Sequence, residues 1–325
     1  MKTLSLLPSI VFTLPSASAW WCDGHMLTAQ VALDSGIMSA GSIQSAQAII
    51  AEIASYYPQS PEMISSACWA DDLKSEGAYQ EANWHFIDIP VESASNPPPN
   101  PPPSPPTENV VWAVTEGQST VYNKKSTLLD KSRQLRFIVH FVGDVHQPLH
   151  AASYFSEQFP DGDAGGNAWP ITLPAAPFYT NELHAVWDSG NGLWVNDLSR
   201  PLNASSQAYL KDFAANIMKE FPSTDPTIAQ KIKDYNVTNW AIESNEYAAT
   251  VAYTAPQSPT PIPQSYIDNG QTLCKQQIAI GGYRLASLIE FIFTTTSDKR
   301  AKEWRDEAIE SLIKKYRKGN TRLRH

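Results

Sequence analysis

Two histidine–aspartate pairs in apolar, helix-like stretches restrict the possible folds more than any other feature of the chain. In "RFIVHFVGDVHQPLH", His140 and Asp144 are four residues apart, and "NELHAVWD" spaces His184 and Asp188 in the same way. Residues four apart lie on one face of an α-helix. Burying so many ionisable groups without a compensating partner costs several kcal/mol each, so the fold must bring opposite charge to them.

Further histidines and aspartates accompany these pairs. His150 lies just beyond the Pro148 interruption, and the upstream sequence adds Asp71 in "CWADD", His85 and Asp88 in "NWHFID", and His25. Imidazole and carboxylate are the ligand types that suit zinc. The alternative is that these groups only satisfy hydrogen bonds in the interior. Two separate His-x-x-x-Asp pairs favour a metal site over that alternative.

The remaining pattern predicts an all-α fold, because apolar residues keep helical spacing and no stretch alternates between apolar and polar residues for long. The expected helices are 25–33, 42–54, 110–129, 135–145, 182–188, 206–220, 237–254 and 276–293. We expect a single domain over residues 20–297. The run "NPPPNPPPSPP" at 96–106 is predicted to be a stiff surface loop, since proline lacks the amide donor that a helix or central strand requires. A docking peptide for a proline-recognition domain is the alternative.

Both ends of the chain differ from this domain. Residues 1–19 combine Lys2, a short apolar run and a small-residue Ala17-Ser18-Ala19 site, which is typical of a secretory signal peptide. Cleavage after Ala19 would make Trp20 the first residue. Residues 298–325 contain ten Lys or Arg against five Asp or Glu, with apolar residues on one helical face. We expect a basic amphipathic tail packed on the domain, with binding to a membrane surface or to nucleic acid as alternatives.

Charge and cysteine content add two constraints. Asp and Glu outnumber Lys and Arg by 33 to 24, which argues against nucleic acid as a partner unless bound metal supplies the positive charge. In an oxidising compartment the three cysteines permit one disulfide, and we favour Cys22 with Cys68 because both lie beside candidate ligands, although the sequence does not fix the pairing. Asn203-Ala-Ser205 and Asn236-Val-Thr238 are glycosylation sequons.

These motifs together carry a family resemblance. The chain resembles the secreted class I zinc nucleases, which include fungal single-strand-specific nucleases, plant bifunctional nucleases and protist 3′-nucleotidases. The resemblance runs from Trp20 to about Leu288. It rests on the tryptophan with His25, "WAD", "HFID", "HFVGDVHQPLH", "GGN" and "HAVWD", which occur in the family's order.

The resemblance implies an all-α fold around three zinc ions. By it, Asp71, His85 and His140 hold one zinc, and His150, His184 and Asp188 hold a second. A third zinc would bind His25 together with the amino nitrogen and carbonyl of Trp20, and Asp144 would bridge the first and third. Trp21 stands where relatives usually have glycine, and we expect its indole to form a wall of the site. His146 matches no ligand and is interpreted as structural.

The same resemblance assigns substrate roles. Asp71, Lys74 and Asp144 would belong to the catalytic centre, with Lys74 holding a phosphate. Phe86 would stack on a base while Asp88 hydrogen-bonds its edge, and Gly165, Gly166 and Asn167 would complete the pocket. A hydroxide bridging two zincs would attack phosphorus in line with the O3′ leaving group, which releases 5′-mononucleotides. The expected substrates are single-stranded DNA and RNA and 3′-nucleotides.

Two other functions remain possible from the sequence. A zinc phospholipase C shares the terminal tryptophan and the cluster, but such enzymes are expected to carry Glu at the match of Asp188. A secreted zinc-binding protein without catalysis would keep the ligands and lose Lys74 or the base pocket. Asp188, Phe86, Asp88 and the "GGN" loop favour the nuclease. We expect a secreted or secretory-lumenal protein with no obligate protein partner and no membrane span.

Overall fold

The computed structural model describes residues 20–174, 180–196 and 198–295, and these residues confirm the predicted all-α class. The expected signal peptide at 1–19 and basic tail at 298–325 lie outside the described residues. The α-helices are α1 (Cys22–Asp34), α2 (Ala40–Ala51), α3 (Met63–Ser66), α4 (Trp69–Ser75), α5 (Val110–Tyr122), α6 (Leu128–Asp144), α7 (Leu183–Asp188), α8 (Ala204–Glu220), α9 (Pro226–Ile232), α10 (Val237–Thr250) and α11 (Gln264–Thr294).

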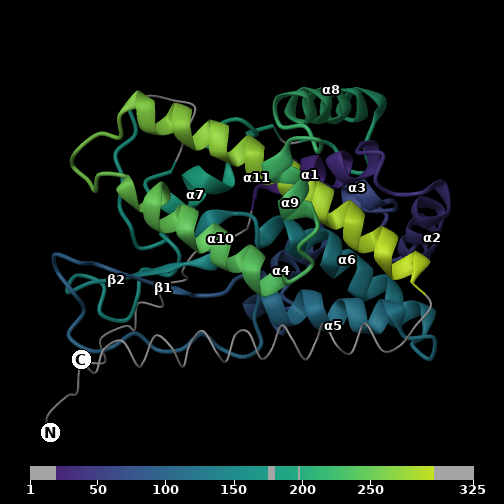
Figure 1. Ribbon diagram of the computed structural model, residues 1–325, viewed down its shortest axis with the longest axis horizontal. Coiled ribbons are helices and arrows are strands. Elements are labelled where there is room, and N and C mark those ends of the chain that lie inside the picture. The colour runs from purple at the N-terminus through teal and green to yellow at the C-terminus, as the bar shows by residue number, and fades with distance from the viewer. Residues whose placement is uncertain (1–19, 175–179, 197, 296–325) are drawn as a thin grey trace, which may run out of the picture.

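Short elements connect these helices near one end of the molecule. Three 3₁₀ turns are η1 (Ala82–His85), η2 (Pro148–Ala151) and η3 (Ala252–Thr254). Strands β1 (Pro90–Glu92) and β2 (Ser153–Phe155) pair in parallel, with Pro90 opposite Ser153. In Figure 1 this ribbon lies at the end opposite α2. The pairing ties the segment after His85 to the segment after His150, so two candidate ligands enter the same region.

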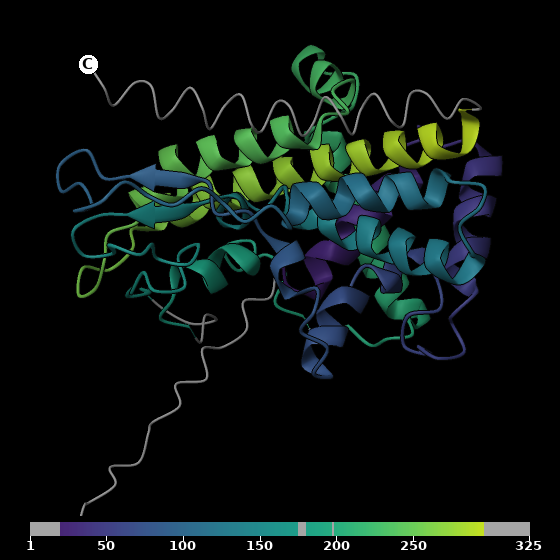
Figure 2. The same ribbon diagram turned by 90° about the horizontal axis from the view of Figure 1, so that it is seen from below.

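The long helices pack along the length of the molecule. α5 and α6 form an antiparallel hairpin, while α11 packs against both α1 and α6 (Figures 1 and 2). One apolar cluster gathers residues of α2, α5, α6 and the end of α11, and a second gathers residues of α7, α8 and the first half of α11. Helix α1 contributes to both, with Ala29 and Ala32 in the first cluster and Met26 and Leu27 in the second.

Local sequence explains where several of these helices begin. The side chains of Asn109, Thr127 and Asn203 each accept a hydrogen bond from a backbone amide in the first turn of α5, α6 and α8, respectively. Such N-caps satisfy amides that have no partner within the helix. The cap at Thr127 also explains why the predicted helix 110–129 is wrong at its end: α5 stops at Tyr122, and α6 begins separately at Leu128.

Other predicted bounds also differ from the structure. The last helix begins at Gln264 rather than at residue 276, and the short helices α3, α4 and α9 were not predicted. The proline-rich stretch 96–106 forms neither helix nor strand and is mostly exposed, as expected for a surface loop. None of the helices among the described residues is both long and apolar enough to cross a membrane.

The predicted disulfide is confirmed, and it helps to position the site. Cys22 is the first residue of α1, Cys68 precedes α4, and their sulfur atoms are bonded. This bond fixes the start of α1, which carries His25, next to the start of α4, which carries Asp71. Cys274, the odd cysteine, is free and buried in α11.

Candidate metal centre

The first ligand group is built on the last turns of α6. His140 and Asp144 lie one turn apart, and Nε2 of His140 is 3.3 Å from Oδ2 of Asp144. His85, at the end of η1, brings its Nδ1 to 3.0 Å from the same oxygen and to 3.1 Å from Nε2 of His140. All three side chains are buried.

Two further side chains complete this region. Asp71 on α4 places Oδ1 3.6 Å from Nδ1 of His85, and Nζ of Lys74 lies 3.1 Å from the same oxygen. His25 on α1 stacks on the ring of His140 with 3.8 Å between the ring centroids, and its Nε2 is 3.3 Å from Oδ1 of Asp144. Oδ1 of Asp144 therefore faces His25, and Oδ2 faces both His85 and His140.

A glycine allows this close approach between α1 and α6. A Cβ at Gly143 would lie 2.7 Å from Nδ1 of His25, a distance that real contacts do not tolerate. The carbonyl of Gly143 accepts a hydrogen bond of 2.9 Å from Nε1 of Trp20, whose indole is fully buried. The indole of Trp20 is thus fixed next to Gly143, which precedes Asp144 and lies against His25.

The second ligand group joins η2 to α7. Nε2 of His150 is 3.1 Å from Nε2 of His184, which lies 3.3 Å from Oδ2 of Asp188. Nδ1 of His150 bonds to the carbonyl of His85, and Nδ1 of His184 bonds to the carbonyl of Gly165. Each Nδ1 is therefore the donor, and each Nε2 faces its partners with a lone pair, as a metal ligand requires.

Gln147 holds the second group together, and the sequence reasoning missed it. Its buried Nε2 donates to Oδ1 of Asp188 at 2.6 Å, while its Oε1 accepts from the amide of Leu149 at 2.6 Å in the first turn of η2. One amide thus connects the element that carries His150 to the carboxylate of Asp188. An amide is not a zinc ligand type, so a search for ligands alone passes over it although it lies inside the quoted motif.

Unsatisfied buried atoms show whether a cation fits these groups. Among the described residues, Nε2 of His25 and both carboxylate oxygens of Asp144 are buried without a hydrogen bond of good geometry, although three imidazoles lie within 3.3 Å of Asp144. Oδ1 of Asp71 also lacks such a bond, and the ammonium of Lys74 lies 3.1 Å from it. Buried polar groups are normally satisfied, and leaving charged ones unpaired is expensive. A cation among these atoms would satisfy them. Three sets of side chains have ligand atoms close enough to share an ion: His25, His140 and Asp144; Asp71, His85 and His140; and His150, His184 and Asp188.

Most of the pKa shifts agree with this interpretation; that of His140 is the exception, since burial lowers its pKa but the charges of Asp144 and Asp71 raise it by more. Burial lowers the pKa of His25, His85 and His150 well below the ordinary histidine value, so these rings are neutral and can donate a lone pair. Burial also raises the pKa of Asp144 to about 6 and that of Asp188 well above the ordinary range. Their charged forms need an opposite charge, which a divalent cation provides.

The predicted base-binding residues surround a cavity of about 380 Å³ beside the second group. Phe86, Asp88, Gly165 and Asn167 line it together with His150 and His184. Burial and the neighbouring carboxylate of Asp163 raise the pKa of Asp88 to about 6. Gly165 has a positive φ of 65°, and a Cβ there would lie 2.6 Å from the carbonyl of Leu149, so this wall of the cavity requires glycine.

Asp163 was also missed by the sequence reasoning. Its buried Oδ1 accepts hydrogen bonds from the amide of Tyr154 at 2.8 Å and from the hydroxyl of Tyr253 at 2.9 Å. These bonds attach the loop that contains Gly165 to β2 and to η3. No residue-type pattern in the sequence distinguishes Asp163 from the neighbouring Asp161.

His146 lies outside the ligand groups, in agreement with its interpretation as structural. Its ring lies in a buried contact with α11, where Nη1 of Arg284 donates to Nε2 at 2.9 Å, and Nδ1 donates to the carbonyl of Val142 at 2.7 Å. Burial and the charge of Arg284 lower the pKa of His146. The ring is a neutral link between α6 and α11.

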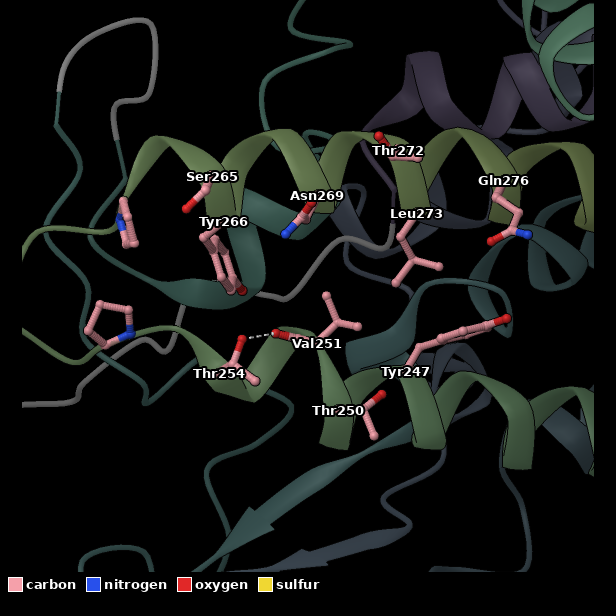
Figure 3. Close-up of a pocket in the computed structure, with 12 residues that line it drawn as sticks. Tyr247, Thr250, Val251, Thr254, Ser265, Tyr266, Asn269, Thr272, Leu273 and Gln276 are labelled. Carbon is pink, nitrogen blue, oxygen red and sulfur yellow. Dashed lines mark hydrogen bonds between the residues drawn. The ribbon is translucent and has the colours of Figure 1, made fainter.

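A second hollow lies between the end of α10, η3 and the first turns of α11 (Figure 3). Its lining residues carry no formal charge, and they include Tyr247, Tyr266, Asn269 and Gln276. It offers neither a carboxylate nor an imidazole to a metal ion and no cation to a phosphate.

Comparison with known proteins assigns the family. The S1/P1 nuclease family matches residues 20–294, and the chain belongs to that family. Nuclease S1 of Aspergillus oryzae is 26% identical over 315 residues, which cover 90% of this chain and 99% of the relative. Nuclease P1 of Penicillium citrinum is 28% identical over 84% of this chain and 97% of its own length. Endonuclease 4 of Arabidopsis thaliana is 24% identical over 86% and 91%.

Proposed function

As a member of the S1/P1 nuclease family, the protein is, we propose, a secreted zinc-dependent phosphodiesterase that hydrolyses single-stranded DNA and RNA to 5′-mononucleotides and removes phosphate from 3′-nucleotides. One observation carries this proposal most directly. Three His/Asp groups have ligand atoms close enough to share metal ions, and one of these groups, through His150 and His184, lines a cavity that is also lined by an aromatic ring, a carboxyl group and a backbone loop. A group that could hold the metal for phosphate chemistry thus lies next to a cavity that could hold a base.

The proposed ligands follow the three groups. Asp71, His85 and His140 would hold one zinc, and His150, His184 and Asp188 would hold another. Trp20 and His25 would hold the third, with Asp144 shared between the first and third. Zinc bound there would supply a Lewis acid and lower the pKa of its water. The unsatisfied oxygens of Asp144 support this assignment, because ordinary protein hydrogen bonds leave them without a partner.

The chain's own residues would bind and orient the substrate. Lys74, whose ammonium lies 3.1 Å from Asp71, would contact the phosphate as a point charge. Phe86 would stack on the base, and Asp88 would hydrogen-bond the base edge beside the loop of Gly165 and Asn167. Stacking tolerates any base, since every base has a π-face. Bases in a duplex are already stacked and paired, so single strands would be preferred.

Secretion and domain limits also belong to the proposal. The Cys22–Cys68 disulfide supports an oxidising compartment, where such bonds persist. We propose that residues 1–19 are removed, that residues 20–297 form the nuclease domain, and that residues 298–325 form a basic amphipathic tail. Removal of residues 1–19 would give Trp20 the free amine that its ligand role requires.

The test assays the purified mature protein on three substrates. Release of 5′-mononucleotides from denatured DNA and from RNA, with no release of phosphocholine from phosphatidylcholine, is the expected result. Hydrolysis of the phospholipid alone would instead support a phospholipase C. Zinc binding without hydrolysis of any substrate would support a binding protein that has no catalytic activity.

A further inference from the structure

Trp21 is one of the few large apolar side chains that the described residues leave open to solvent. Its side chain is 36% exposed, whereas the indole of the preceding Trp20 is fully buried. Among residues 20–174, 180–196 and 198–295, no other aromatic ring packs against the indole of Trp21. A partly exposed indole keeps an apolar face available to a ligand, and Trp is enriched at interfaces for this reason.

The backbone of Trp21 is firmly attached to the metal centre. Its amide donates to the carbonyl of Asp188 at 2.9 Å, and its own carbonyl accepts from the amide of Gly24 at 2.7 Å at the start of α1. Trp21 therefore lies between a ligand of the second group and the helix that carries His25. Its position is fixed by the same elements that assemble the site.

This position differs from that of the base cavity. Phe86 directly follows His85, whose carbonyl accepts the hydrogen bond from His150, and the cavity reaches His150 and His184. Trp21 does not line that cavity and is attached to the third member of the group, Asp188. Two aromatic side chains are thus anchored to different ligands of one metal group.

A phosphodiester bound at the metal centre has a nucleoside on each side. Under the proposed function, the Phe86 cavity would take one base, that of the nucleotide whose O3′ departs. We propose that Trp21 is a stacking platform for the other base, on the 3′ side of the scissile phosphate. This inference rests on the proposed function, because it requires a bound nucleic acid. A ring on a fixed backbone suits this role, since little backbone freedom is lost when a base stacks on it.

The inference separates two classes of substrate. A dinucleotide contains the second base, whereas a 3′-mononucleotide has only the base that the Phe86 cavity accepts. Trp21→Leu should lower kcat/KM for a dinucleotide such as ApA by about 5- to 150-fold, the range that corresponds to loss of one stacked base. The same variant should hydrolyse 3′-AMP within about twofold of the unchanged protein, because that substrate has no base to stack there.

Two further variants sharpen the test. Trp21→Phe keeps an aromatic face and should restore most of the dinucleotide rate. Tyr56→Leu removes an exposed ring in the turn after α2 and should leave the hydrolysis of both ApA and 3′-AMP unchanged. Zinc content is measured on each variant, so that damage to the metal centre is recognised.

The outcomes distinguish the inference from the proposed function. If Trp21→Leu leaves ApA hydrolysis unchanged, or lowers ApA and 3′-AMP hydrolysis equally, the stacking role is wrong while the nuclease assignment stands. If the unchanged protein hydrolyses neither substrate, the proposed function fails, and the role of Trp21 fails with it.

Discussion

The two ligand groups of the metal centre are built from the same side-chain types but differ in how the protein satisfies them. In the second group, backbone carbonyls hold the histidines, and Gln147 holds Asp188. In the first group, both oxygens of Asp144 and Nε2 of His25 are buried without a hydrogen-bond partner among the described residues. Protein hydrogen bonds thus reach all three members of the second group, whereas in the first group the carbonyl of Ala67 holds Nδ1 of His140 but the carboxylate of Asp144 is left without a hydrogen-bond partner in the described part of the chain.

This difference indicates how each group should respond to change. Removing a side chain from the first group should leave the charges of its buried neighbours without compensation, which is energetically costly. In the second group the supporting hydrogen bonds can be removed separately from the ligands. Changes to a supporting residue there typically alter metal affinity or activity by about 10- to 100-fold.

The largest effect is expected at Asp144, which faces His25, His85 and His140. Asp144→Asn removes the shared charge and should lower hydrolysis of single-stranded DNA on the order of 10³-fold, comparable to the loss of a preorganised electrostatic contact. Zinc per chain should fall as well. Asp72→Asn is the matched control, since this carboxylate pairs with Arg200 at 2.6 Å outside the ligand groups. Equal zinc content in Asp144→Asn and the unchanged protein would contradict the role of Asp144.

An additional residue before Trp20 should have the next largest effect. It would convert the terminal amine to an amide, which is a poor ligand at neutral pH, and the zinc shared through Asp144 would be weakened. Activity should fall on the order of 10²-fold. The comparison uses protein secreted through its own leader, with Trp20 confirmed by mass spectrometry as the first residue, and protein that retains Met before Trp20. Equal rates and equal zinc content would show that the amine is not a ligand.

A substitution of Gln147 tests whether its hydrogen bonds support the second ligand group. Gln147→Leu removes the donor to Asp188 and the acceptor for Leu149, so zinc affinity at one of the sites should fall by about 10- to 100-fold. Gln277→Leu is the control, because Gln277 is also buried but donates to the carbonyl of His146 at 3.1 Å rather than to a candidate ligand. Chelator titration measures both variants. An identical change in the two would mean that Gln147 matters only for packing.

Acidification should weaken metal binding in the first group by a smaller and gradual amount. Zinc requires the carboxylate form of Asp144, and burial raises the pKa of this group to about 6. Below pH 6 protons compete with zinc, so affinity should fall by about tenfold per pH unit for each proton displaced, while above pH 6 this contribution levels off. Zinc titration between pH 4 and 8 checks the sign. Affinity that rises on acidification would contradict the assignment of Asp144.

The sequence predicted which histidines and aspartates lie together better than it predicted the elements that carry them. His140 and Asp144 share a helix, and their spacing is visible in the sequence; the resemblance then supplied the partners from distant segments. The beginning of α11 was missed because residues 264–275 are mostly polar, although Tyr266, Gly270 and Leu273 are buried there. The parallel pairing of β1 with β2 joins segments about 60 residues apart, which local patterns do not reveal.

Supporting residues were the least predictable part of the site. Gln147 and Asp163 act through hydrogen bonds to Asp188 and to the backbone of Tyr154, and those partners are defined only once the chain has folded. Residue type indicates what a side chain can ligate. It does not indicate which ligand a neighbouring amide will hold.

The central claim is that the buried histidines and aspartates hold zinc for hydrolysis of single-stranded nucleic acid. Its most direct test is the zinc content of mature protein beginning at Trp20, measured by mass spectrometry together with release of 5′-mononucleotides from denatured DNA. The account predicts three zinc ions per chain and loss of activity as a chelator removes them, with recovery when zinc is restored. Full activity in protein without bound metal would contradict it.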